Sequence, residues 1–419
     1  MPAPRDLGAV TQVELWNMEK VNYRRIFIIA GTGALLLSYL GIWLRMINDP
    51  VERTGSDFIH FYSAGRIAQI HGPEHVYNLR LQHDFEEAQV GFEVADNQFL
   101  PYNHMPFLIP LLQLTMSTDY VQSFYRWVAC MIAVYLLGLI VLRQLCQAMA
   151  ADIRSVHTLI IGGLLFLPFF VSLMNGQDTA ILFLGTTMWA YGLITRNSWL
   201  AGAGLSLTLI RPHISLLLAL PMLFHDRKVF LSYGIGSGLL AAISFLILGV
   251  QGTQEFIAML LLSAGGEGYG IKPEAMFNLI GGLTRLVPWL TGDQIRLVGW
   301  LVYGLTVIGL CVFWKKQNWT TYPIGLTVIL ALFVAPHLYF HDLTILLISI
   351  TGLYLFSDET GTPKTLTVAI SPIIISLLFL VSNISPYLQY LVPYLVMTGL
   401  AMYAYLPTSR GLITRPHRS

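Results

Sequence analysis

The chain has 419 residues, of which 55% are hydrophobic and only 11% are charged. A soluble domain carries about 25% charged residues, so this composition argues against a soluble protein and indicates a membrane protein with several spans. The formal net charge of +1 gives no reason to expect nucleic acid as a partner. The three cysteines, Cys130, Cys146 and Cys311, lie in or beside apolar runs and offer neither a disulfide framework nor a spaced metal cluster.

The first long apolar run covers Ile26–Met46, which is long enough to span because about 20 residues cross the hydrocarbon core. No small-residue cleavage site follows it, so we expect an uncleaved anchor. A polar segment, Gly55–Arg66, comes soon after this anchor. Within the loop 48–104, Asp57–His71 and Leu81–Val90 show helical apolar spacing, and we expect both to be interfacial helices on the membrane surface.

Asp57 stands at the start of the first of these helices and has two interpretations. As a general base it would face the outer surface of the bilayer, where the helix dipole and the free backbone N–H groups favour the ionised form that accepts a proton. As a structural residue, Asp57 or Ser56 would simply cap the helix.

Further apolar runs follow, and several are shorter than a full span. They cover Val121–Leu142, His157–Ser172, Gln177–Thr195, Val229–Val250, Gln294–Trp314, Tyr322–Ala335, Leu343–Phe356, Leu366–Val381 and Tyr387–Leu406. Met105–Met116 is too short to cross and is expected to dip into the outer leaflet. No internal repeat is visible, so residues 1–419 are predicted to form a single all-α, polytopic integral-membrane domain of about 10–12 transmembrane helices.

Orientation follows from the positions of the 24 Lys and Arg residues. With the N-terminus in the cytoplasm, most of them fall in the two termini and in the short inner loops. The C-terminus is then cytoplasmic as well, and the loop 48–104 with Asn175–Asp178 and Pro336–Asp342 faces outward. We therefore expect a multi-pass protein of the cytoplasmic membrane whose active site lies on the extracytoplasmic side.

The run Trp199–Phe224 is interrupted by Arg211-Pro212-His213, and each half is too short to cross alone. A re-entrant hairpin with its tip inside the membrane fits better, because irregular backbone survives there only beside a polar cavity. Arg211 at the tip would bind a lipid-carried phosphate bidentately, or it would pair with a buried carboxylate or cap carbonyls inside the bundle. His213 would join the phosphate site or serve as a hydrogen-bonded packing residue.

Three outward segments mix polar groups with turns or rings. In Asn175–Asp178, Asp178 is expected to cap a helix, whereas Gln177 is a candidate for orienting a hydroxyl-rich ligand. Tyr102–Pro106 and Glu267–Lys272 combine aromatic and polar residues, as sugar sites do, although interfacial aromatic belts have the same composition.

Pro336–Asp342 places His337 and His341 four residues apart, which is metal-ligand spacing if the segment is helical. The glutamate of a zinc-protease helix is missing, and Pro336 interrupts the helix. We therefore expect no metal site. These side chains are instead expected to line the outward cavity, or Asp342 to cap the following span.

Several of these segments, in this order, resemble one known family. They are Asp57-Phe58 with Tyr62 and Ala64-Gly65-Arg66, then Val76-Tyr77-Asn78, Tyr102 to Phe107, Gly176-Gln177, and Ala201-Gly202 to Pro212. The family is glycosyltransferase family 87, membrane mannosyltransferases of the GT-C fold that use polyprenyl-phosphate-mannose. The resemblance covers about the first half of the chain. Arg211 stands where the family usually has lysine, and His104-Met105-Pro106 where it commonly has paired prolines.

The resemblance implies a GT-C-like bundle that moves a hexose, mannose in the family, from a polyprenyl-phosphate donor to a glycolipid or glycan hydroxyl without a metal or cofactor. It implies that Asp57 is the catalytic base and that Arg211 meets the donor phosphate. We predict that His213, His337 and His341 assist Arg211. The predicted substrate contacts are His60, Tyr62, Arg66, Tyr102, His104, Gln177 and Lys272. A GT-C enzyme for another lipid-phosphate sugar such as arabinose, and a lipid or sugar transporter, remain as alternatives.

Overall fold

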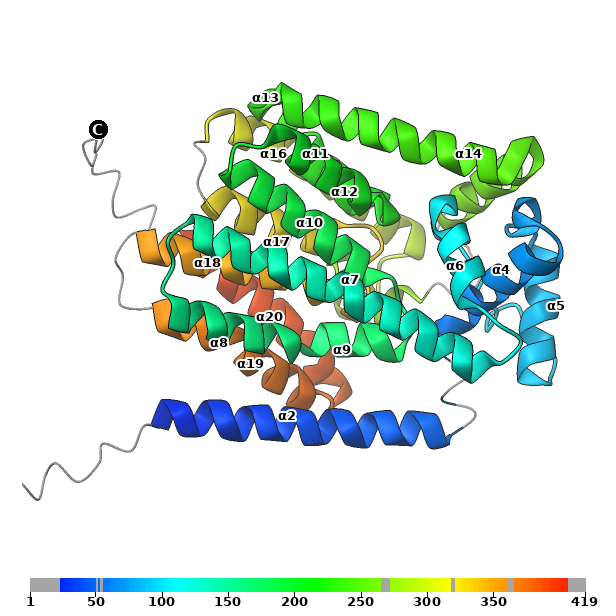
Figure 1. Ribbon diagram of the computed structural model, residues 1–419, viewed down its shortest axis with the longest axis horizontal. Helices are drawn as coiled ribbons and strands as arrows, with labels where there is room; N and C mark the ends of the chain where they lie inside the picture. The colour runs from blue at the N-terminus through cyan, green and yellow to red at the C-terminus, as the bar shows by residue number, and fades with distance from the viewer. Residues whose placement is uncertain are drawn as a thin grey trace, which may run out of the picture.

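The computed structural model describes residues 23–49, 52, 56–264, 272–317, 321–359 and 365–405, and these form helices and their connections without a strand (Figure 1). Among these described residues, five helices are long and apolar enough to cross a membrane, and shorter apolar helices of 10–17 residues pack among them. The described chain is therefore an all-helical bundle of the kind expected for a polytopic membrane protein.

The first half of the bundle follows the predicted runs closely. Its helices are α2 (Tyr23–Asn48), α7 (Tyr120–Ala148), α8 (Ile153–Leu164), α9 (Leu167–Met174) and α10 (Thr179–Ile194). The anchor α2 lies along one edge of the bundle (Figure 1), where Tyr39 stacks on Phe170 at 4.1 Å and donates a hydrogen bond to the carbonyl of Leu165. The predicted run His157–Ser172 is two helices, because the chain breaks at residues 165–166, just before Pro168.

The loop after α2 folds into a compact helical cap at one end of the bundle, on the right of Figure 1. It contains α4 (Phe58–Ile70), η1 (Pro73–His75), α5 (Leu79–Val90), η2 (Pro106–Leu108) and α6 (Ile109–Thr115). Ten of the 13 residues of α4 are buried, so this helix is covered by protein on nearly all faces. The helices α5, α6 and α7 pack against it. Its position at the membrane surface stays a prediction.

Trp199–Phe224 forms the predicted hairpin. It consists of α11 (Ser198–Leu207), η3 (Thr208–Ile210), α12 (Pro212–Ala219) and α13 (Met222–His225). Its two ends meet where Ser198 bonds the Asp226 carboxylate at 2.8 Å. Arg211 sits at the tip with φ −129° and ψ 79°, because a residue before proline avoids the helical region.

The next helix, α14 (Arg227–Ala264), is longer than the predicted run Val229–Val250 and turns at Gly249, where φ is 63° and ψ is −167°. A residue with a side chain rarely adopts these angles. Beyond this kink the helix lies against the helical cap formed by the loop after α2, where Phe256 meets the ring of Tyr77 at 4.9 Å. The kink therefore brings the end of α14 against η1 and η2 of this cap.

The second half completes the bundle. Its elements are η4 (Pro273–Ala275), α15 (Leu279–Leu286), α16 (Gly292–Lys315), α17 (Thr321–Val334), η5 (Phe340–Ile345), α18 (Leu346–Glu359), α19 (Thr365–Ser382) and α20 (Pro386–Tyr405). Residues 335–339 are not helical, so His337 and His341 do not share a helix face and the metal-ligand spacing considered above does not form. Phe277 N–H bonds the carbonyl of Leu338 at 2.9 Å and holds this segment beside η4.

Candidate active site

Asp57 occupies the N-cap position of α4, but its side chain makes no capping hydrogen bond. Instead, its Oδ2 accepts a hydrogen bond of 2.7 Å from Nε2 of Gln177, and among the described residues its Oδ1 has no hydrogen-bond donor. The carboxylate is part-buried rather than sealed in the core. An acidic group held by one oxygen and open at the other has the geometry that proton abstraction requires.

The turn between α9 and α10 brings Gln177 to this place. Gly176 has φ +65°, and a Cβ added there would stand 2.6 Å from Cβ of Phe58, so only glycine lets the turn approach the start of α4. Trp127 Nε1 donates to the carbonyl of Gly176 at 2.7 Å, and Gln177 N–H bonds the carbonyl of Ser172 at 2.8 Å. The turn is therefore fixed from both sides.

Arg211 reaches the same place from the hairpin tip and lies between two buried carboxylates. Its NH2 is 3.0 Å from Oδ1 of Asp178 and 3.3 Å from Oε1 of Gln177, and its Nε donates to Oδ1 of Asp342 at 3.2 Å. NH1 donates to the carbonyl of Ile210 at 3.1 Å. Every guanidinium nitrogen thus has a protein partner, and a phosphate would reach a two-point contact only by displacing one of them.

Asp178, Arg211 and Asp342 form an ion cluster, and three histidines lie around it. His104 Nδ1 is 2.8 Å from Oδ2 of Asp178, and the ring of His60 stacks on His104 with centroids 5.1 Å apart. His341 Nε2 is 3.7 Å from Oδ2 of Asp342. Burial lowers the pKa of His60 well below its usual value, so its ring is neutral. Burial alone would raise the pKa of Asp178, but Arg211 and His104 outweigh burial and hold the carboxyl ionised.

The structure thus gathers six of the predicted residues around one point: Asp57, His60, His104, Gln177, Arg211 and His341. Their roles remain predictions. The cluster also contains Asp178 and Asp342, which the sequence had suggested as helix caps. A buried arginine requires a nearby carboxylate, and this requirement is what could have pointed from Arg211 to Asp178 and Asp342 in the sequence.

The other predicted residues have partners of their own. His213 and His337 face each other with ring centroids 6.4 Å apart, and His337 Nε2 is 3.3 Å from the carbonyl of Ser263. Tyr102 is fully buried, and its backbone N–H is held by Gln82.

Tyr62 and Arg66 point toward the far side of α4. The Tyr62 hydroxyl donates to the carbonyl of Thr118 at 3.2 Å, and Arg66 bonds Gln69. Lys272 is exposed, and its backbone N–H lies 3.5 Å from the Tyr339 hydroxyl. The neighbouring segment 267–271 lies outside the described residues.

A family model for glycosyltransferase family 87 matches residues 104–338, more than half of the chain. This chain belongs to glycosyltransferase family 87. It is accordingly a membrane-embedded glycosyltransferase, which replaces the alternative of a transporter. The matched range contains His104, Gln177 and Arg211 and ends before Asp342, while Asp57 precedes it. No curated protein and no solved structure matches the chain.

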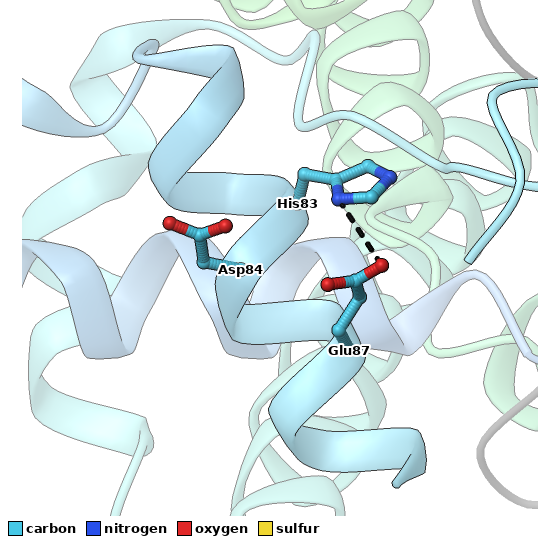
Figure 2. A group of neighbouring side chains, drawn as sticks. All are labelled: His83, Asp84 and Glu87. Atoms are coloured by element: carbon cyan, nitrogen blue, oxygen red, sulfur yellow. Dashed lines mark ion pairs between the residues drawn. The ribbon is translucent and has the colours of Figure 1, made fainter. Parts of the chain in front are cut away.

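In the described part of this glycosyltransferase, one group of possible metal ligands lies within 4.8 Å: His83, Asp84 and Glu87, on consecutive turns of α5 (Figure 2). His83 Nε2 and Glu87 Oε1 bond the carbonyl and the N–H of Val94, at 2.8 and 2.9 Å. Asp84 is exposed and points away from the other two in Figure 2. These contacts fasten the loop after α5 to its helix, which is a structural role.

The glycosyltransferase also contains a mostly apolar cavity of about 300 Å³ between α2, α9, α19 and α20. Its lining includes Ile42, Phe170 and Phe379, and Asn383 and Gln389 supply polar groups. Two further lining residues, Asn175 and Phe340, directly precede the segments that carry Gln177 and His341. The cavity and the ion cluster thus share two chain segments.

Proposed function

We propose that this glycosyltransferase moves a hexose, mannose by resemblance, from a polyprenyl-phosphate donor to a glycolipid or glycan hydroxyl on the extracytoplasmic side of the cytoplasmic membrane. The observation that carries the proposal is the placement of Asp57. Asp57 is the N-cap residue of α4, but its carboxylate makes no capping hydrogen bond. The carboxylate is held through Oδ2 and lies beside the buried ion cluster.

The reaction is a single displacement. The acceptor oxygen bonds the anomeric carbon, the bond from that carbon to the phosphate oxygen breaks, and the hydroxyl proton passes to Asp57. The departing polyprenyl phosphate is a weak base and takes the bonding electrons without a general acid. One displacement inverts configuration, so a β-linked donor gives an α-linked product. The proposed step needs neither a metal ion nor a cofactor.

The donor tail would occupy the apolar cavity between α2, α9, α19 and α20, whose rings and aliphatic groups suit an isoprenoid chain. Two of the residues that line the cavity, Asn175 and Phe340, lie close in sequence to Gln177 and His341. A donor bound in the cavity would therefore have its phosphate near the ion cluster. Arg211 would stabilise that phosphate by its field, with His213, His337 and His341 as the nearby groups able to donate hydrogen bonds.

Asp57→Asn tests the proposal directly. Purified protein in lipid nanodiscs is given radiolabelled polyprenyl-phosphate-mannose and a lipid and glycan extract as the acceptor source. We expect transfer to fall by roughly 10²–10⁴-fold in Asp57→Asn, because a positioned base contributes about that factor. An unchanged rate in a folded variant would contradict the role of Asp57.

The donor sugar is tested separately. Polyprenyl-phosphate-arabinose assayed in parallel with the mannose donor identifies the head group, and we expect the mannose donor to be preferred. A preference for the arabinose donor would leave the proposed role of Asp57 unchanged and would show that the donor sugar is not mannose.

A further inference from the structure

Gln177 lies between the ion cluster and Asp57 and bonds both. Its Oε1 accepts from NH2 of Arg211 at 3.3 Å and its Nε2 donates to Oδ2 of Asp57 at 2.7 Å. The orientation of this amide follows from its neighbours. A guanidinium can only donate and a carboxylate can only accept, so the amide oxygen must face Arg211 and the amide nitrogen must face Asp57.

Arg211 in turn has little freedom. It is clamped between Asp178 and Asp342, and its side chain is 11% exposed. Since the guanidinium is planar and its donors have fixed directions, two carboxylates hold its orientation as well as its position. Gln177 is itself 5% exposed and sits on the turn that Trp127 and Gly176 fix.

We propose that Gln177 is a positioning residue: the Arg211 cluster holds its carboxamide, and the carboxamide fixes Asp57 so that Oδ1 is presented to the acceptor hydroxyl. This deepens the proposed function and rests on Asp57 being the base. It replaces the direct ligand contact predicted for Gln177 with an action through Asp57. The carboxamide carries no charge, so it fixes the carboxylate without forming an ion pair that would weaken it as a base.

The test is a pair of near-isosteric variants, Gln177→Met and Gln177→Glu. Methionine removes both hydrogen bonds, whereas glutamate keeps an acceptor for Arg211 and removes the donor to Asp57. Gln122→Met is the matched control, because Gln122 is an exposed glutamine on α7. Thermal melting of all three in nanodiscs first establishes that they are folded.

We expect kcat to fall by roughly 10–100-fold in both Gln177 variants, since small misplacements of a reacting group cost rates of that order. The KM values for donor and acceptor should stay within about 2-fold, because neither substrate is contacted. Gln122→Met should match the wild type. A raised KM with unchanged kcat would overturn the proposal in favour of direct substrate binding.

The pH profile separates positioning from a merely structural role. Loss of the amide donor disfavours the ionised carboxylate, so the acidic limb of the kcat profile should move to higher pH in Gln177→Met. It should move further in Gln177→Glu, which places a second carboxylate beside Asp57. The titratable and charged groups around Asp57 and Gln177, which remain in both variants, are His60, His104, Asp178, Arg211, Tyr339, His341 and Asp342. An acidic limb that stays in place in both variants would overturn the proposal.

The two proposals fail differently. If Asp57→Asn is inactive while Gln177→Met keeps the wild-type kcat, the positioning role is wrong and the base assignment stands. If Asp57→Asn keeps its activity, the base assignment itself is wrong, and with it the proposed action of Gln177.

Discussion

Glu86 is a buried carboxyl group on α5, in the helical cap, and is 2% exposed. Leu100 N–H donates to its Oε2 at 3.3 Å, and among the described residues its Oε1 has no hydrogen-bond partner. Burial raises the pKa of Glu86 to about 8, so the side chain is protonated at neutral pH in the folded protein. An unfolded chain would ionise it well below that pH.

Glu86→Gln should therefore stabilise the protein in a pH-dependent way. Between the unfolded and folded pKa values the folded state binds the extra proton, so the stability associated with Glu86 falls as pH rises toward about 8. Glutamine needs no such proton, and we expect a gain of up to roughly 3 kcal/mol near pH 7 and almost none near pH 4.5. Melting temperatures across this range measure it. Glu93→Gln, at an exposed position, is the control. It should change the melting temperature little at any pH in this range.

The partners of Arg211 are only partly predictable from the sequence. Its place at the tip of an apolar hairpin already predicts either a ligand or a buried carboxylate as its partner. The sequence cannot choose the carboxylates, because Asp342 is 131 residues away and both aspartates stand where helix caps are common. The choice depends on how the hairpin, the α9–α10 turn and η5 pack together.

At the scale of elements, α4 is packed among other helices in a way that its own sequence does not predict. Apolar spacing predicts its helix correctly, yet it cannot tell whether the remaining faces meet lipid, water or protein. In the structure Gly65 approaches α6 so closely that an added Cβ would lie 2.4 Å from Met116, and Phe58 packs edge-on against Phe124. These long-range contacts give α4 a fixed position, and that position sets the direction of Asp57.

Gly176→Ala tests the contact between the α9–α10 turn and α4. Alanine at φ +65° costs about 1–2 kcal/mol, and its Cβ would collide with Phe58, so Gln177 should move away from Asp57. We expect kcat to fall by at least about 10-fold, as assayed above. The matched control is Gly91→Ala, which has φ +80° but no atom within 4 Å of an added Cβ. It should lose similar stability and keep its activity. Equal activity in both variants would contradict the contact's role.

At the scale of the whole molecule, hydropathy predicts most of the bundle, because a span must be long, apolar and internally hydrogen bonded. It also predicts the hairpin, since Arg211-Pro212 interrupts an otherwise apolar run. It misses the kink at Gly249, because the apolar pattern simply ends there while the helix turns and continues to Ala264. It also misses the ion cluster, whose members Asp178, Arg211 and Asp342 come from three separate segments.

That cluster should matter for the stability of the bundle as well as for catalysis. Arg211→Met leaves Asp178 and Asp342 as buried carboxylates without their cation, and removing one partner of a buried ion pair costs about 3–5 kcal/mol. We expect a strongly lowered melting temperature in nanodiscs. The triple variant Arg211→Met, Asp178→Asn, Asp342→Asn removes the uncompensated charge, so it should recover much of the stability. Its activity should stay low, because the donor phosphate has lost the field of Arg211 and Gln177 has lost its anchor. A single variant that melts like the wild type would mean that the three side chains do not hold the hairpin to the rest of the bundle.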